Sequence, residues 1–296
     1  MRIDYLVPFL STILWGSTSP VSKLVLLELG PIPLGFLRQS IASVAFLAWL
    51  AARGQLRWPR DLTWRVAGEF VALAIFGLFA SQLAAVIALS LVPASVHGVV
   101  ANTSPLFIAL GSALVLRESL SARAILGVTL SLAGITVLFG QAAVSSAAGL
   151  IAGEVSLTGV LCSLTSSAAW AAFTVGGRSI LKRYDVVATN FVLMLISAVA
   201  FVPVLVVTDG FHFWDAVSPQ TWPLVLYLGV CSSAVANAFW YFGLSRLPAT
   251  RVGVLQYLAP IWTVILSAFI LGEPITAGLI FALVLVLGGV RLVQRA

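Results

Sequence analysis

The segment ALSLVPAS, residues 88–95, returns 155 positions later as GLSRLPAT, residues 243–250. The same offset aligns further segments and single residues without a gap: SPLF at 104–107 with APIW at 259–262, LRESLS at 116–121 with LGEPIT at 271–276, Trp15 with Trp170, Lys23 with Arg178, and Gln82 with Asn237. Chance similarity between apolar stretches would not place prolines, tryptophans and glutamates in one register. The sequence therefore predicts an internal duplication, with about 145 residues in each unit.

The composition is that of a polytopic membrane protein. Hydrophobic residues make up 60% of the 296 positions, charged residues only 9%, and the mean hydropathy is +1.09. These values exclude a soluble globular protein. The net charge of +6 comes from basic residues beside the apolar runs, so we expect no nucleic-acid partner. Cys162 and Cys231 lie inside apolar runs, which argues against a disulfide framework.

Ten apolar runs are expected to be membrane-spanning helices, because a helix satisfies its own backbone hydrogen bonds in lipid. We place them at residues 5–27, 34–52, 66–91, 94–116, 122–140, 157–181, 186–208, 222–246, 249–271 and 275–293. Pro93 and Pro248 stand in very short connectors, where proline stops one helix before the next begins.

The distribution of Lys and Arg predicts the orientation in the membrane. Of the 16 basic residues, 14 flank one set of helix ends, and only Lys23 and Arg38 flank the opposite set. Basic residues near helix ends stay on the cytoplasmic side. We therefore expect a multi-pass protein of the bacterial inner membrane, with the N and C termini in the cytoplasm.

Each repeat holds an odd number of helices, five, so the second repeat must enter the membrane in the opposite sense to the first. The predicted fold is an all-α polytopic membrane protein of ten transmembrane helices arranged as a 5+5 inverted-topology repeat. The first repeat is expected at residues 1–145 and the second at residues 155–296, with a short linker at 141–156. Such folds enclose a site near the midplane and open it to either side alternately.

Several of these residues carry a family resemblance. LWGST at 14–18, SPL at 104–106, AP at 259–260, and the glutamates Glu118 and Glu273 after the fourth and ninth helices, together with the 5+5 duplication, resemble the drug/metabolite transporter superfamily. More narrowly, the chain is similar to the EamA-type ten-helix carriers of that superfamily over almost its whole length. The resemblance implies a transporter that exports amino acids or related small metabolites.

Polar and aromatic side chains gather at one predicted depth in six of the spans. They are Trp15, Ser17, Ser81, Gln82, Asn102, Ser104, Trp170, Asn237, Trp240, Tyr241, Gln256 and Tyr257. Uncompensated polar groups are costly in hydrocarbon, so we expect these side chains to line a substrate cavity. The alternative is that the hydroxyls and amides join neighbouring helices, at about 0.6 kcal/mol each. The absence of a deep charge favours small zwitterionic or neutral solutes over permanent cations.

Two prolines and two tryptophans admit a structural reading beside the functional one. Pro105 and Pro260 each remove a hydrogen bond in mid-helix, which frees a backbone carbonyl for a ligand or produces a bend alone. Trp15 and Trp170 are repeat mates at mid-depth, where an indole suits an amphiphilic solute, although a tryptophan in a span also serves as packing.

Coupling and gating are predicted from the few charged groups. The acidic residues lie at helix ends, so facilitated efflux is the expected mode, with His97 the candidate proton site, or a hydrogen-bonded structural histidine. If Lys23 pairs with Glu273 at the outer end, the repeat requires a mirror pair of Arg178 with Glu118 inside. The alternative is that both glutamates favour the dipole of the helix that follows them.

Other function classes fit less well. The chain has two histidines, no HExxH or GxSxG motif and no carboxylate pair in a span, so an intramembrane enzyme is not expected. No charged ring or filter-like glycine run suggests a channel. A proton-coupled exporter of drugs, nucleosides or purines shares the architecture and stays open. We expect no metal and no cofactor, a small-molecule substrate, the lipid bilayer as surroundings, and a monomer.

Overall fold

The protein is described here by a computed structural model covering residues 3–54, 63–104, 106–107, 121–147, 156–177, 180, 183–208, 211–246 and 255–294. Regular structure in these ranges is helical. Pro105, Glu118 and Arg178 of the predicted site lie outside the described residues, as does the side chain of Tyr241.

The described helices group into ten spans, five in each half of the chain. In the first half they are α1 (Ile3–Gly16) with α2 (Thr18–Val25), α3 (Pro31–Ala52), α4 (Trp64–Ala72) with η1 (Leu73–Phe79) and α5 (Ala80–Leu91), α6 (Ala94–Ala101), and α8 (Ala122–Ala147). In the second half they are α9 (Leu157–Gly176), α11 (Val186–Thr208), α13 (Trp222–Tyr227) with η2 (Leu228–Val235) and α14 (Ala236–Arg246), α16 (Leu258–Leu271), and α17 (Ala277–Gln294). A short helix, α12 (Phe213–Ala216), precedes α13.

These bounds confirm the spans expected from hydropathy, with most described ends within three residues. Five described helical stretches are long and apolar enough to cross a membrane: 31–52, 64–91, 157–176, 186–208 and 222–240. The predicted ends at 116, 181 and 249 lie outside the described residues, and two other features differ from the expectation. Helix α8 continues to Ala147 instead of ending at 140, and the first span is interrupted at Ser17, between α1 and α2.

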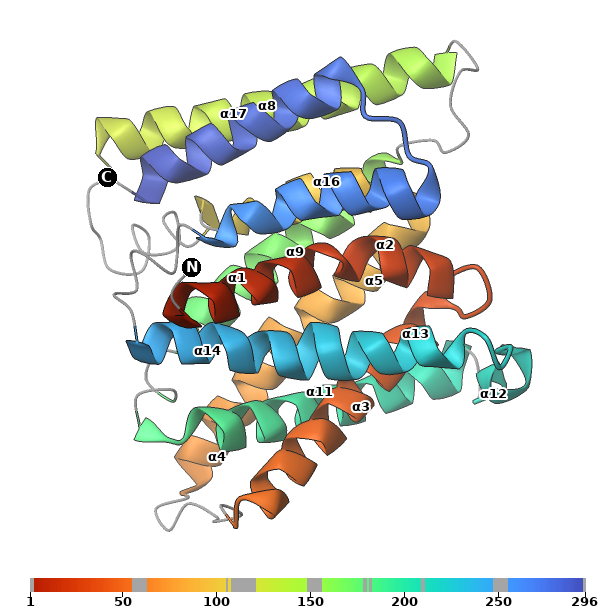
Figure 1. The fold of residues 1–296 in the computed structure, drawn as a ribbon, viewed down its shortest axis with the longest axis vertical. Helices are drawn as coiled ribbons and strands as arrows, with labels where there is room; N and C mark the ends of the chain where they lie inside the picture. Colours follow the sequence, from red (N-terminus) through yellow and green to blue (C-terminus); the bar gives the residue numbers. More distant parts are fainter. Residues whose placement is uncertain are drawn as a thin grey trace.

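The two halves are an inverted repeat, as predicted. Adding 155 to the bounds of α3, η1, α5 and α8 gives the starts of α11, η2, α14 and α17 to within one residue. Helix α1 begins and α17 ends on one side of the molecule, the left in Figure 1, whereas α9, the mate of the α1–α2 span, begins on the opposite side. The fold is therefore a ten-helix membrane protein built from two oppositely oriented five-helix units.

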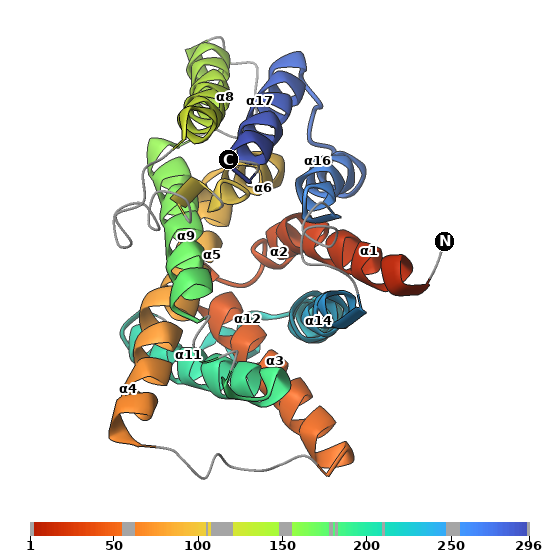
Figure 2. The same cartoon turned by 90° about the vertical axis from the view of Figure 1, so that its left-hand side faces the viewer.

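Repeat mates pack directly against each other at both ends of the bundle. Helices α8 and α17 form one end, and α3 packs on α11 at the other (Figure 2). Between them lie two mixed pairs, α5 with α9 and α1 with α14, which are also related by the repeat. The contacts between elements thus follow the same two-fold symmetry as the sequence.

The contact between α8 and α17 is close enough to require small residues. A Cβ added at Gly134 would lie 2.9 Å from the carbonyl oxygen of Ala282, and one added at Gly289 would overlap the carbonyl oxygen of Gly127 and the Ser131 hydroxyl. Gly134 and Gly289 are repeat mates. Backbones that approach this closely pack through van der Waals contact, the main attraction between helices in lipid.

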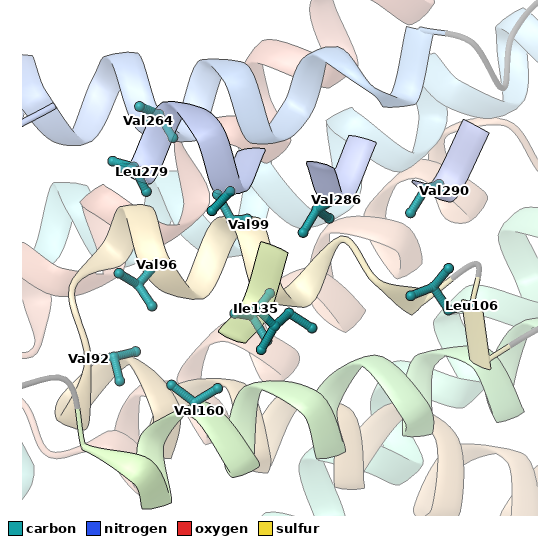
Figure 3. Close-up of a cluster of buried hydrophobic side chains, with 12 residues drawn as sticks. Val92, Val96, Val99, Leu106, Ile135, Val160, Val264, Leu279, Val286 and Val290 are labelled. Carbon is teal, nitrogen blue, oxygen red and sulfur yellow. The ribbon is translucent and has the colours of Figure 1, made fainter. Parts of the chain in front are cut away.

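A buried aliphatic cluster joins this end of the bundle to the spans beside it. Val96 and Val99 of α6, Val264 of α16, and Leu279 and Val286 of α17 belong to it (Figure 3). It combines side chains from both repeats, so the two halves share one packed interior instead of forming separate cores. Packing of this density resists changes in side-chain volume.

The third and eighth spans each contain a π-helix, η1 and η2, at the same repeat position. At both, a glycine allows a neighbouring helix to approach. A Cβ at Gly77 would lie 2.8 Å from Cβ of Phe173, and one at Gly229 would overlap the side chain of Ile41. A π-helix is rare and frequently marks a functional site.

We predict that Gly289→Ala destabilises the protein and that Gly288→Ala does not. The first substitution places a methyl group against the backbone of α8, and overpacking of this kind costs about 1–3 kcal/mol. The second faces open space, with no atom within 4 Å. Thermal unfolding in detergent, followed by the fluorescence of the nine tryptophans, compares the two neighbours in one helix. An equal Tm for both variants would contradict the tight α8–α17 contact.

Candidate functional site

Within the described parts of the spans, five sites depart from regular α-helix. The first span has a turn at Ser17, whose own backbone N–H and carbonyl keep their helical hydrogen bonds. The third and eighth contain η1 and η2, the fourth leaves the helix at Asn102, and the ninth has a turn at Tyr257 before α16. Asn102 and Tyr257 are repeat mates. Broken helices in a membrane are tolerated where the freed backbone groups find partners or line a cavity, and they point to the binding site in transporters built from repeats.

The hydroxyl groups at these breaks mostly join helices. Ser17 Oγ lies 2.6 Å from the Tyr227 hydroxyl, and Thr18 Oγ1 lies 2.5 Å from Ser232 Oγ on η2. The Ser81 hydroxyl of α5 donates to the backbone carbonyl of Ser166 on α9 at 3.0 Å. Ser17 and Ser81 therefore join neighbouring helices, which was the alternative to lining a cavity in the sequence analysis.

Asn102 and Ser104 are also engaged or buried. Asn102 Nδ2 donates to the carbonyl of Gly98 within its own helix at 2.6 Å, and Ser104 is buried. The carbonyl of Ala101, which a proline at position 105 leaves without its helical donor, accepts a hydrogen bond from Ser167 Oγ at 2.9 Å. Pro260 stands in the first turn of α16, where proline costs little, so it marks a helix start instead of a mid-helix bend.

Three of the four amides predicted to line the cavity are left over for a solute. Gln82, Asn237 and Gln256 are half-buried and make no hydrogen bond within the described ranges. Gln82 on α5 and Asn237 on α14 are repeat mates, so each repeat contributes one of them. An amide with both donor and acceptor capacity unused inside a membrane protein is costly unless water or a ligand meets it.

The aromatic residues form two pairs, one between the repeats and one within α9. The rings of Trp15 on α1 and Trp240 on α14 lie 5.1 Å apart and tilted by 50°. Trp170 instead stacks on Phe173 at 5.1 Å and packs against a buried cluster of α4, η1 and α11. Asn237 precedes Trp240 by three residues, which puts both on one face of α14. Tyr257 is half-buried against the cluster of Figure 3.

Lys23 and Glu273 hold the same turn from its two sides, without an ion pair between them within the described residues. The Lys23 ammonium donates to the carbonyls of Leu89 at 2.5 Å and Val92 at 2.9 Å, at the end of α5. The Glu273 carboxylate accepts from the backbone N–H groups of Ala94 at 2.7 Å and Ser95 at 3.0 Å, at the start of α6.

This arrangement replaces the direct pair expected from the sequence. A cation at a helix C-terminus and an anion at a helix N-terminus are both favourable, because the unpaired carbonyls and N–H groups carry opposite partial charges. Glu273 caps α6 of the other repeat, whereas the alternative reading placed it at the start of α17. The hydroxyl of Ser95 adds a further hydrogen bond to the carboxylate at 2.5 Å.

His97, the candidate proton site, is a buried residue of α6 with a defined hydrogen bond. Its Nδ1 lies 2.9 Å from Ser163 Oγ on α9. The Ser163 hydroxyl donates to the carbonyl of Gly159 at 3.0 Å, so its lone pair accepts from His97 Nδ1–H. This geometry fits the alternative interpretation from the sequence, that His97 is a hydrogen-bonded structural residue.

The sequence analysis did not predict the polar face of the eighth span or the hydrogen bond that Arg38 makes with it. Tyr227, Ser232 and Ser233 receive side chains from the first and second spans. Arg38 had been assigned to an outer helix end, but it is a half-buried residue within α3 and its Nε donates to Ser233 Oγ at 3.1 Å. The signal available was the run of two serines inside an apolar stretch. Within the described residues, no group of acidic, histidine or cysteine side chains could hold a metal ion.

Comparison with known proteins agrees with the repeat and the fold. A model of the EamA-like transporter family matches residues 2–140 and again residues 157–295. An uncharacterized transporter of Archaeoglobus fulgidus is 26% identical over 91% of this chain and 89% of its own length. The aromatic amino acid exporter YddG of Ancylobacter novellus is 28% identical over 73% of this chain and 72% of its own length. A crystal structure superposes with a TM-score of 0.67 at 26% identity, covering 98% of this chain and 94% of the other.

We predict that Glu273→Gln shifts the conformational equilibrium toward a state with the Lys23 end of the bundle open. The substitution removes the charge from three hydrogen bonds on α6, and charge-assisted bonds contribute about 1.5–3 kcal/mol each. Spin labels at Ser90 and Ala277, with Cys162 and Cys231 replaced by serine, report the distance across this end. A longer component should grow at least tenfold relative to the short one.

The matched control is Glu28→Gln. Glu28 lies beyond the end of α2, and it also accepts backbone and side-chain hydrogen bonds, from Ser218 at 2.8 and 2.9 Å. It does not touch the α5–α6 turn. If both substitutions change the distance distribution equally, or neither changes it, the gating role of Glu273 is rejected.

Proposed function

The chain belongs to the EamA-like transporter family, and on that premise we propose that it exports amino acids, aromatic ones in particular, from a bacterial cytoplasm. Transport would proceed by alternating access around a midplane cavity between the repeats. The family and the names of the relatives identify a transporter and not an enzyme.

The observation that carries the proposal is the contiguous surface formed by Trp15, Trp240 and Asn237. Two half-buried indoles from opposite repeats meet beside an amide that makes no hydrogen bond within the described ranges. Stacking or edge contacts with an aromatic solute contribute about 0.5–1.5 kcal/mol beyond burial. The export activity named for the YddG relative is consistent with such a surface.

Alternating access is supported by the way the spans are attached. Lys23 and Glu273 fasten the α5–α6 turn to α2 and to the segment before α17. Of these contacts, those of Glu273 join the second repeat to the first, so breaking them would let the repeats separate at one end only, which is the motion an inverted repeat needs. The 155-residue offset relates Lys23 to Arg178, Glu273 to Glu118, and residues 89–95 to residues 244–250. From the sequence alone, we therefore propose that Arg178 and Glu118 hold residues 244–250 in the same way at the other end.

We favour facilitated diffusion as the energetic mode. Among the described residues, each acidic side chain lies at or near a helix end, including Asp4, Glu69 and Glu273, and proton-driven exchange usually needs a carboxylate inside a span. His97 is buried and hydrogen-bonded to Ser163. The termini are proposed to lie in the cytoplasm and the active form to be a monomer, because both halves of one transport unit are in a single chain.

We predict counterflow of labelled tryptophan or phenylalanine into proteoliposomes preloaded with the same unlabelled amino acid. Exchange should exceed that of alanine, and an imposed pH gradient should leave its rate unchanged. Nucleobases and cationic dyes form the comparison arms. Dye transport accelerated by a pH gradient, or exchange of nucleobases alone, would replace the proposal with one of the alternative exporters.

We predict that Trp240→Ala raises the half-saturation concentration for aromatic amino acids roughly tenfold, in line with the loss of one ring contact and its buried area. Trp240→Phe should retain most of the affinity. Trp214→Ala is the control, because Trp214 stacks on Trp222 at 5.3 Å and is half exposed, away from the breaks. Equal effects of Trp214→Ala and Trp240→Ala would show that the aromatic pair has no specific role.

A further inference from the structure

Arg38 is a cation inside a membrane span. It lies seven residues after Pro31, the first residue of α3, which corresponds to about 10 Å along the helix axis. Protein surrounds the guanidinium, which keeps some accessible surface. Ionisable side chains at such depth are rare and by default mark a substrate or ion pathway.

One hydrogen bond fixes the orientation of the guanidinium. Arg38 Nε donates to Ser233 Oγ at 3.1 Å, and the Ser233 hydroxyl in turn donates to the carbonyl of Leu228 at 2.8 Å. That carbonyl lies five residues earlier in η2, so the π-helix itself presents the serine. The neighbouring Ser232 binds Thr18 at the break of the first span, which places Arg38 at the level of that break.

No described residue compensates the charge of Arg38. Within the described ranges no carboxylate lies within 4 Å of it, and its Nη1 and Nη2 atoms make no hydrogen bond. Lys23 and Arg38 are both near enough to interact electrostatically with His97, so the surroundings add positive charge. Lys23 has Glu273 nearby, whereas no acidic side chain among the described residues forms an ion pair with Arg38. A buried charge without a partner is strongly unfavourable.

We propose that Arg38 is the carboxylate-binding residue of the substrate site. A guanidinium anchored through Nε leaves both terminal nitrogens free to bind the two oxygens of a carboxylate. A lysine ammonium cannot make this bidentate contact. This inference rests on the proposed function and specifies it: the transported solutes carry a carboxylate, and amines that lack one are excluded.

The spacing along the eighth span accommodates an aromatic amino acid. Trp240 follows Ser233 by seven residues, about two helical turns farther along the same span. A solute whose carboxylate meets Arg38 thus extends its side chain toward Trp240 and its partner Trp15. The polar and the aromatic contacts are contributed by different helices and can be tested separately.

The test compares four ligands that differ in their charged groups: phenylalanine, 3-phenylpropionate without the amine, phenethylamine without the carboxylate, and inorganic phosphate. Binding to the full-length protein in detergent is measured by thermal stabilisation, and transport by counterflow. The wild type should bind the two carboxylates at least tenfold more tightly than phenethylamine or phosphate. Arg38→Gln should abolish that preference, and Arg38→Lys should restore only part of it.

Arg53→Gln is the matched control, an arginine at the C-terminus of the same helix whose guanidinium lies over Trp49. It should leave the preference unchanged. If Arg38→Gln weakens the binding of the carboxylates and of phenethylamine equally, Arg38 has a structural role and the proposal is overturned. A wild-type protein that binds phosphate more tightly than the carboxylates would also overturn it.

The same panel separates this inference from the proposed function. Binding of 3-phenylpropionate but no transport of amino acids would reject amino acid export and keep the carboxylate site. Transport of phenylalanine that Arg38→Gln leaves intact would keep amino acid export and reject the site. Binding of none of the four ligands would reject both.

Discussion

The bilayer supplies no hydrogen-bond partner to a backbone that leaves the helix, and the structure is organised around meeting that need from side chains. Ser167 binds the carbonyl of Ala101 where the fourth span leaves its helix, and Ser233 binds the carbonyl of Leu228 inside η2. At the α5–α6 turn, Lys23 donates hydrogen bonds to backbone carbonyls and Glu273 accepts hydrogen bonds from backbone N–H groups. In each case a side chain forms a hydrogen bond with a backbone group that lacks its usual helical partner. The side chain comes from a residue distant in sequence or one turn away.

The breaks follow the two-fold symmetry of the repeat, but the chemistry around them does not. Both π-helices are present, yet η1 has the sequence LAIFGLF whereas η2 has LGVCSSAV. Consequently the polar contacts to Ser17, Thr18 and Arg38 all converge on the second repeat. A symmetric scaffold therefore surrounds an asymmetric site, which is what binding an asymmetric solute requires.

Hydropathy and the repeat predicted the spans, their inversion and the turn at Pro93, because apolar length is dictated by the bilayer and proline ends a helix. The partners of Lys23 and Glu273 were not predictable, since sequence reasoning pairs opposite charges and overlooks backbone groups at helix ends. Arg38 was misplaced because the span was expected to begin at residue 34, whereas α3 begins at Pro31. The π-helices leave no hydropathy signal, because an extra residue per turn changes register and not composition. Of the predicted cavity residues, Ser17 and Ser81 make interhelical contacts and Asn102 binds its own helix, whereas solute binding by Gln82, Asn237, Gln256, Trp15 and Trp240 stays a prediction.

The seam between α8 and α17 has the geometry of an isologous interface, with Gly134 facing Ala282 and its mate Gly289 facing Gly127. In a homodimer of five-helix chains, each substitution would appear twice, once on either side of the axis. Covalent fusion removes that restriction, because a change on one side need not be copied on the other. Gly127 and its mate Ala282 already differ, and the serines of η2 without counterparts in η1 are a divergence that a symmetric pair of identical subunits could not have acquired.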